Sequence, residues 1–158
     1  MNTAEKIGNI LTNHKLTIST TESCTGGLLS SYLTDVSGSS AYIRLNLVTY
    51  ANEAKNKMLQ VQTEILDKYG AVSEECSYQM AKGLCELTDS DICVSTTGIA
   101  GPTGGTPEKP VGLMFSTIYS KNKFKTYKIQ VDSNLSRTEI KEKFTQKVLE
   151  NILEFLNQ

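Results

Sequence analysis

The sequence predicts an α/β fold, a three-layer α/β/α sandwich around a mixed, mostly parallel sheet. Short β-branched runs alternate with helical patterns over the first two-thirds of the chain, which is typical of parallel strands joined by crossover helices. Two further strand patterns then follow each other across the turn at 121–123, which adds an antiparallel hairpin. The length of 158 residues fits one domain spanning 1–158.

The first four elements are predicted from periodicity and turn residues. Ile7, Ile10 and Leu11 recur at helical spacing, whereas the strands are short runs rich in β-branched and aromatic residues. A Ser-Gly cluster separates the second helix from the second strand. These elements are a helix over 3–13, a strand over 16–20, a helix over 28–36 and a strand over 42–50.

Capping residues predict most of the later helices. Asn52 is expected to cap a helix that ends at Met58, and Ser73 a helix that ends at Leu87. A capping-box pattern at Ser136-Arg137-Thr138-Glu139 opens the last helix. The other expected elements are a short helix over 63–69 and strands over 91–97, 113–120 and 124–131.

Composition excludes several classes of protein. The formal net charge is −1, from 16 basic and 17 acidic residues, which argues against a nucleic-acid binder. No apolar run approaches the roughly 20 residues that span a bilayer, so no membrane partner is expected. The amino-terminal residues lack the pattern of a signal peptide, which predicts a cytoplasmic protein.

Histidine and cysteine usage argues against a metal site and against a disulfide framework. The chain has one histidine, His14, and its four cysteines form no CxxC pair. Buried free thiols are therefore expected, and no metal or cofactor is predicted. The cysteines are Cys24, Cys76, Cys85 and Cys93.

Three strand ends are expected to meet in one crevice, because ligands of such sheets bind beyond the carboxyl ends of the strands. These ends are Ser23, Tyr50 and Gly98. Ser23 is followed by Thr25-Gly26-Gly27 and a helix, whose amides could hold an oxyanion or a phosphate. The alternative is that Ser23 or Thr25 only caps the helix while the glycines form a tight turn.

A serine nucleophile needs a base, and His14 is expected at the opposite end of the strand from Ser23. A lysine can serve instead if burial lowers its pKa. Lys55 and Lys57 follow the second strand, and helical spacing places Lys55 on the face of Asn52 with Lys57 elsewhere. From periodicity alone, both lysines would be surface residues.

Residues 98–112 contain five of the eleven glycines and all three prolines. This composition favours a structured binding loop over an ordinary long turn, because glycine permits positive φ and proline stiffens the chain. Arg137 lies near the start of the last helix, where it could bind a phosphate or pair with Glu139.

Together, the runs at 21–27, 48–55, 70–73 and 98–112 resemble the CinA carboxy-terminal domain family over essentially the whole chain. The resemblance implies a three-layer α/β/α fold with a mixed sheet, usually as a homodimer. It places Ser23 on the family's nucleophile, Lys55 on its base and Tyr50 on a supporting tyrosine that orients the lysine or relays the proton. Arg137 matches an arginine before the last helix.

Members of that family include an amidohydrolase that converts nicotinamide mononucleotide to nicotinate mononucleotide and ammonia. The resemblance implies the same reaction here, with a pyridine nucleotide as substrate and no cofactor. The alternative is a non-catalytic nucleotide-binding or regulatory domain that acts through protein partners. This chain has Asn46 where many members have glycine, and Lys141 where a second arginine is frequent. The expected substrate-binding residues are Thr25, Gly26, Gly27, Asn52, Gly98, Gly101, Gly104, Gly105 and Arg137.

Overall fold

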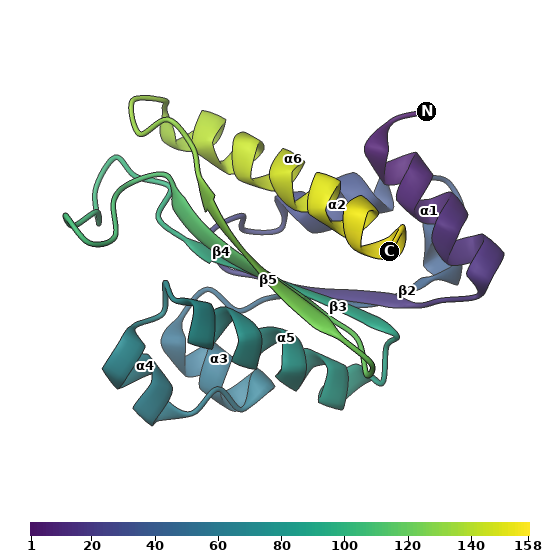
Figure 1. Ribbon diagram of the computed structural model, residues 1–158, viewed down its shortest axis with the longest axis horizontal. Helices are drawn as coiled ribbons and strands as arrows, with labels where there is room; N and C mark the ends of the chain where they lie inside the picture. The colour runs from purple at the N-terminus through teal and green to yellow at the C-terminus, as the bar shows by residue number, and fades with distance from the viewer.

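The computed structural model describes residues 1–158 and contains one five-stranded sheet between two layers of helices (Figure 1). The strand order is β2-β1-β3-β4-β5, with β1 parallel to β2 and β3, and the β3–β4 and β4–β5 pairs antiparallel. The predicted mixed sheet and its hairpin are therefore confirmed. The strands are β1 (Ile18–Glu22), β2 (Ile43–Val48), β3 (Ile92–Gly98), β4 (Leu113–Tyr119) and β5 (Phe124–Gln130).

The helices divide between the two faces of the sheet, three on each (Figure 1). One face is covered by α1 (Thr3–His14), α2 (Leu28–Thr34) and α6 (Arg137–Leu156). The other is covered by α3 (Asn52–Leu59), α4 (Thr63–Tyr69) and α5 (Glu74–Thr88). A short 3₁₀ turn, η1 (Ser39–Ala41), precedes β2. No helix combines the length and the apolar character that crossing a membrane would need.

Two of the three predicted caps are confirmed. Ser73 accepts a hydrogen bond from the amide of Cys76, and Ser136 forms the predicted capping box with Glu139. The expectation for Asn52 is wrong: it is the first residue of α3, and the N-cap is Ala51, which has no capping side chain.

The first two strands are displaced from their predicted positions. β1 begins two residues later than expected, at Ile18, because Thr17 binds the carboxylate of Asp91 through its amide and hydroxyl. β2 ends at Val48, so Tyr50 lies beyond the strand. β1 also ends later than expected, at Glu22, so Ser23 is the first residue after the strand.

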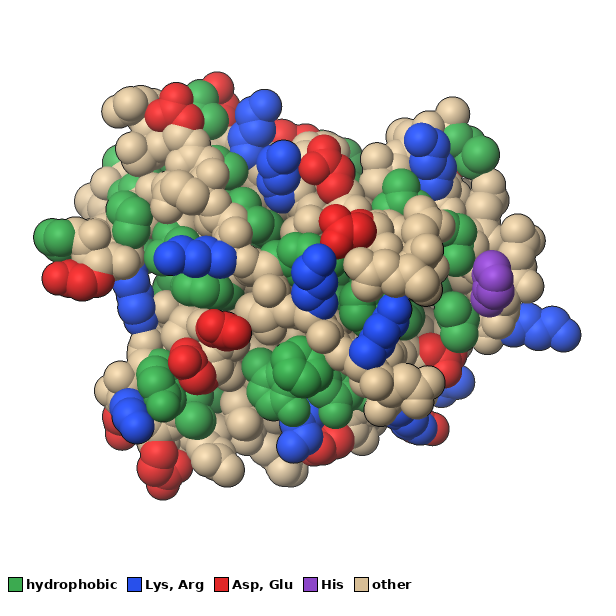
Figure 2. All heavy atoms as spheres, viewed as in Figure 1, with side chains coloured by type: hydrophobic (Ala, Val, Ile, Leu, Met, Phe, Trp, Pro, Cys, Tyr) green, Lys and Arg blue, Asp and Glu red, His purple; other side chains and the backbone are tan.

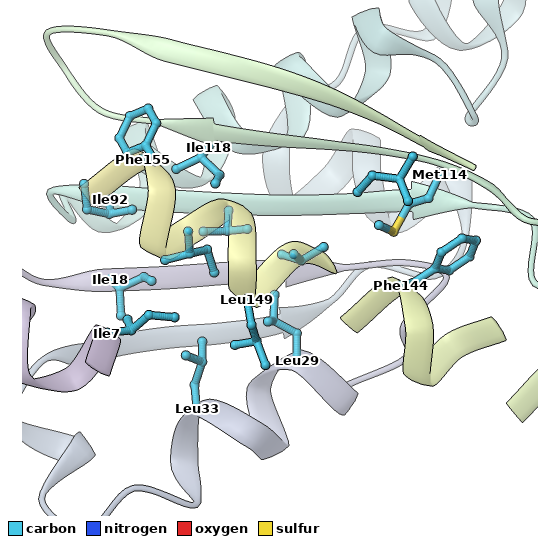
Figure 3. Close-up of a cluster of buried hydrophobic side chains, with 14 of the residues drawn as sticks. Ile7, Ile18, Leu29, Leu33, Ile92, Met114, Ile118, Phe144, Leu149 and Phe155 are labelled. Atoms are coloured by element: carbon cyan, nitrogen blue, oxygen red, sulfur yellow. The ribbon is translucent and has the colours of Figure 1, made fainter. Parts of the chain in front are cut away.

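The larger core lies between the sheet and the layer of α1, α2 and α6 (Figure 3). Phe144, Met114 and Ile118 are fully buried there. A smaller core joins α3 and α5 to the opposite face. All four cysteines are buried and free, as predicted. Figure 2 shows side chains of both charge signs interspersed over the visible surface, which fits the near-zero net charge.

Candidate active site

A cleft of about 250 Å³ lies where the carboxyl ends of β1, β2 and β3 meet. It brings together the three strand ends that the sequence placed in one crevice, at Ser23, Tyr50 and Gly98. The remaining residues of its wall are Cys24, Asn52, Lys55, Ala71, Val72, Thr97, Ile99, Ala100, Gly101, Thr103, Gly104 and Arg137.

Lys55 is buried beneath this cleft, with only 1% of the residue exposed. Its Nζ lies 3.1 Å from Ser23 Oγ, 2.9 Å from the carbonyl oxygen of Thr49 and 3.0 Å from that of Tyr50. The expectation of a surface lysine from periodicity is therefore wrong, whereas Lys57 is exposed and pairs with Glu53. Leu59, one helical turn after Lys55 and also buried, was the signal that this face of α3 points inward.

The surroundings of Lys55 favour its neutral form. Burial lowers the pKa of Lys55 below its ordinary value, because desolvation disfavours the ammonium. A neutral amine has two N–H groups and one lone pair. The carbonyl oxygens of Thr49 and Tyr50 can accept both N–H groups, which leaves the lone pair facing the hydroxyl of Ser23. In this state the Ser23 hydroxyl donates to Lys55.

The backbone around Ser23 is fixed by β3. The Ser23 amide donates to the carbonyl oxygen of Thr96 at 3.0 Å and lies 3.2 Å from its Oγ1. The next residue, Cys24, lines the cleft, and burial raises the pKa of its thiol to about 12. Cys24 is therefore a protonated thiol at neutral pH, and Ser23 is the nucleophile candidate of the two.

Glu22, a residue that the sequence analysis missed, holds the turn after Ser23 from the opposite face of the sheet. Its carboxylate is fully buried and accepts five hydrogen bonds. Three come from the backbone amides of Gly27, Leu29 and Ser30 at the start of α2, at 3.2, 2.9 and 3.0 Å. The hydroxyls of Thr25 and Ser30 donate the other two, each at 2.5 Å. Glu22 thus caps α2 in place of a bound anion.

This arrangement limits the expectation that the amides after Ser23 could hold an oxyanion or a phosphate. The Gly26 amide donates to the carbonyl oxygen of Ser23, and the Gly27 amide to Glu22. The amides of Cys24 and Thr25 have no such partner. Thr25, Gly26 and Gly27 lie outside the cleft, in the wall of a neighbouring hollow.

Tyr50 contacts Lys55 through its backbone and not through its side chain. The carbonyl oxygen accepts from Lys55, whereas the phenol is 60% exposed and its hydroxyl accepts from Arg137 Nη2 at 3.0 Å. Arg137 Nη1 donates to the carbonyl oxygen of Gly101 at 2.6 Å. Arg137 therefore joins the β2 side of the cleft to the β3 side and does not pair with Glu139.

The glycine-rich segment forms one wall of the cleft, as a structured loop. Gly98, Gly101 and Gly104 line the cleft, but Gly105 does not, because it packs against Val111. A Cβ on Gly101 would lie 2.5 Å from Val111 Cγ1, and its φ of +74° also requires glycine. Lys109 ties the far end of the loop to the carbonyl oxygen of Tyr69.

The loop between α4 and α5 supplies a second wall that the site prediction omitted. Ala71 and Val72 line the cleft, and Thr97 donates from β3 to the carbonyl oxygen of Ala71. The run 70–73 was one of those that resembled the family, but the sequence analysis gave its residues no function. His14 is exposed at the end of α1, away from this cleft, and no group of three His, Cys, Asp or Glu side chains is placed to hold a metal ion.

Comparison with known proteins shows the family and the fold. A family model described as the CinA C-terminal domain matches residues 1–156. CinA-like proteins of Chloroherpeton thalassium and Thermotoga maritima are 46% and 43% identical over 97% and 96% of the chain. The chain covers 37% and 36% of those two proteins, so it spans about a third of the length of these curated relatives.

Two solved structures match the fold over nearly all of both chains. The competence/damage inducible protein CihA of Agrobacterium tumefaciens is 41% identical, with a TM-score of 0.94 over 99% of this chain and 94% of its own. The competence damage-inducible protein A of Klebsiella pneumoniae is 29% identical, with a TM-score of 0.93 over 100% and 99%.

Proposed function

The chain belongs to the CinA C-terminal domain family, and from this premise we propose that it is an amidohydrolase with Ser23 as nucleophile and Lys55 as general base. The observation that carries the proposal is the contact between a buried lysine with a lowered pKa and a serine hydroxyl at 3.1 Å. A module that only binds a ligand gains nothing from burying a lysine against a serine. A nucleophile with its base needs this pair.

In the first half of the reaction, neutral Lys55 Nζ takes the proton of the Ser23 hydroxyl while Oγ attacks the carboxamide carbon. Negative charge then develops on the carbonyl oxygen of the substrate. The amides of Cys24 and Thr25 are the donors proposed for it, since those of Gly26 and Gly27 are engaged. The protonated lysine gives its proton to the leaving nitrogen, and ammonia departs from an acyl ester on Ser23.

In the second half, Lys55 takes a proton from water as the water oxygen attacks the ester carbon. The carboxylic acid leaves, and the proton returns to Ser23 Oγ. No step needs a metal ion, because the lysine carries the proton in both halves and the backbone amides stabilise the oxyanion.

The proposed substrate is nicotinamide mononucleotide, which would yield nicotinate mononucleotide and ammonia. Support comes from the family resemblance and from a cleft that combines an amine base, backbone donors and small residues. This chain spans about a third of the length of its longer relatives, so the experiment below tests the activity on this chain itself.

The test is ammonia release from nicotinamide mononucleotide without added metal. The native chain should turn over, whereas Ser23→Ala and Lys55→Ala should each lose at least about 100-fold in kcat/KM. Lys57→Ala is the matched control and should retain native activity, since Lys57 is exposed on the same helix. The rate should fall as pH drops through the lowered pKa of Lys55.

Native rates for the Ser23 variant would refute the nucleophile assignment. Tight binding of the nucleotide without any turnover would favour the alternative, a domain that senses a nucleotide and acts through partners.

A further inference from the structure

The cleft is small compared with sites that enclose a whole nucleotide. Its 250 Å³ lies below the roughly 300–1,000 Å³ of sites that enclose drug-sized ligands. With a carboxamide at Ser23, such a cleft leaves the ribose and the phosphate of a nucleotide near its mouth. A substrate that is a phosphate monoester therefore needs a cation beside the cleft and not within it.

Three other groups near the cleft that could attract a phosphate already make contacts within the protein. Glu22 already occupies the amino end of α2, so an incoming anion there would meet a carboxylate. Arg137 uses one N–H group of each terminal nitrogen within the chain, for the Tyr50 hydroxyl and the carbonyl oxygen of Gly101, which holds the guanidinium across the cleft. Lys109 donates to the carbonyl oxygen of Tyr69.

Lys141 is different, because its ammonium has no partner in the structure. The four ion pairs of the chain use other lysines, at 57, 121, 125 and 147. Lys141 lies one helical turn beyond Arg137 and on the same face of α6. Its Nζ lies over Gly26, 3.3 Å from where a Cβ would stand, in the turn that follows the nucleophile.

Lys141 opens into a hollow of about 470 Å³ next to the cleft. The hollow lies beside the cleft, since consecutive residues line the two spaces. Cys24 and Arg137 line the cleft, and the residues that follow them, Thr25 and Thr138, line the hollow. Ser31 adds a hydroxyl to the hollow. Its one acidic residue, Glu142, forms no ion pair with Lys141, and its carboxylate accepts from the Tyr32 hydroxyl and the Gln146 amide instead.

We propose that this hollow is an anion subsite in which Lys141 binds the phosphate monoester of the substrate. Lys141 is then the residue that selects a phosphorylated amide over the same amide without phosphate. Arg137 holds the two sides of the cleft together through Tyr50 and Gly101, so it contributes equally to the binding of both amides. The inference rests on the proposed function for the identity of the substrate, but the subsite can be tested by binding alone.

The experiment is calorimetric titration of nicotinamide mononucleotide and nicotinamide riboside into the full chain, at fixed ionic strength. The native chain should bind the nucleotide more tightly than the riboside. Lys141→Gln should weaken nucleotide binding by at least about ten-fold and leave riboside binding unchanged. Lys141→Arg should keep the preference, and Lys143→Gln, an exposed residue of the same helix, should behave like the native chain.

Three outcomes would overturn the subsite. The first is equal affinity of the native chain for the two ligands, and the second is an unchanged nucleotide affinity in Lys141→Gln. The third is a selective loss of nucleotide binding in Arg137→Gln but not in Lys141→Gln, which would move the phosphate to Arg137. Binding with the expected preference but without ammonia release would refute the proposed function and leave the subsite standing.

Discussion

Glu22 and Ser23 are neighbours in the chain, but their side chains lie on opposite faces of the sheet. This follows from the two-residue repeat of a strand, which turns successive side chains in opposite directions. Ser23 faces Lys55 on the α3 side, whereas Glu22 faces the first turn of α2. Ser23 is therefore the proposed nucleophile, while Glu22 fixes the turn from the other face of the sheet. The anchor also keeps a negative charge out of the cleft, where it would favour the protonated lysine.

Glu22→Gln should destabilise the fold far more than its small chemical change suggests. The Gln amide nitrogen cannot accept, so donors at one end of α2 lose their partner in the interior, at a cost of roughly 2–4 kcal/mol. Urea unfolding measures this loss. Glu139→Gln is the matched control, because Glu139 is a carboxylate at the start of α6 but is exposed. Equal effects of the two variants would contradict the role of Glu22.

At this scale the sequence located Ser23 in the cleft but did not show what surrounds it. The position of Ser23 at a strand end is a local pattern, although that pattern also fitted a helix cap and the nucleophile role came from the family resemblance. The burial of Lys55 could not be read from its own type, since lysine is rarely buried and only the position of α3 against the sheet removes it from water. For Tyr50, the sequence analysis assigned a role to the side chain, but it is the backbone carbonyl oxygen that accepts from Lys55. Every residue has a backbone carbonyl, so the residue type does not reveal which carbonyl accepts such a hydrogen bond.

At the scale of elements, the distance between α3 and α5 sets the position of Lys55. The two helices touch at Gly83, where a Cβ would lie 2.0 Å from the carbonyl oxygen of Leu59, the last residue of α3. Only glycine allows this approach. Because α3 has eight residues, a displacement at its end is transmitted to Lys55, one turn away.

Gly83→Ala should therefore lower both stability and activity, although alanine favours a helix by about 1 kcal/mol over glycine. The clash with a backbone carbonyl forces the helices apart at a cost of about 1–3 kcal/mol, and Lys55 moves from Ser23. Thermal unfolding and ammonia release report the two effects. The control is Gly8→Ala in α1, where the new methyl meets the far end of the Tyr42 side chain. Full activity in Gly83→Ala would show that α3 is positioned by other contacts.

The predicted element types all agree with the structure, because each helix and strand had its own local signal. The ends of β1 and β2 were misplaced because they depend on pairing between distant segments. Thr17, for example, is drawn out of β1 by Asp91, 74 residues away. The cap at Asn52 failed because Ala51 is the extended residue before the helix, so Asn52 is already the first helical residue.

At the scale of the whole molecule, the sheet order places the three parallel strands side by side, with β1 in the middle. Their carboxyl ends therefore meet at one edge, and alternation of strands and helices was sufficient to predict it. The hollow at Lys141 was beyond sequence reasoning, because α6 reaches the β1–α2 turn only after the chain has folded back across the sheet. The homodimer implied by the family resemblance stays a prediction.

Burial of a base also links the stability of the whole molecule to pH. The pKa of Lys55 is lowered in the folded state from an ordinary 10.5, so between the lowered value and about 10.5 the unfolded chain holds the extra proton. Stability rises with pH wherever the unfolded state binds more protons. Burial raises the pKa of Cys24 to about 12 and that of Cys76 to about 11, so these thiols act oppositely. Their stabilising contribution is present below about 9 and is lost as pH rises further.

Comparison with Lys55→Met isolates the lysine, because the cysteines are common to both proteins. The free energy of unfolding of the native chain should rise relative to that of the variant as pH increases through this window. The slope should not exceed about 1.4 kcal/mol per pH unit, the limit for one proton. Urea unfolding of both proteins between pH 7 and about 10 measures it. A difference that stays flat, or falls, would mean that Lys55 keeps its ordinary pKa in the folded chain, and a lysine with that pKa would be protonated at neutral pH and unable to take the proton of Ser23.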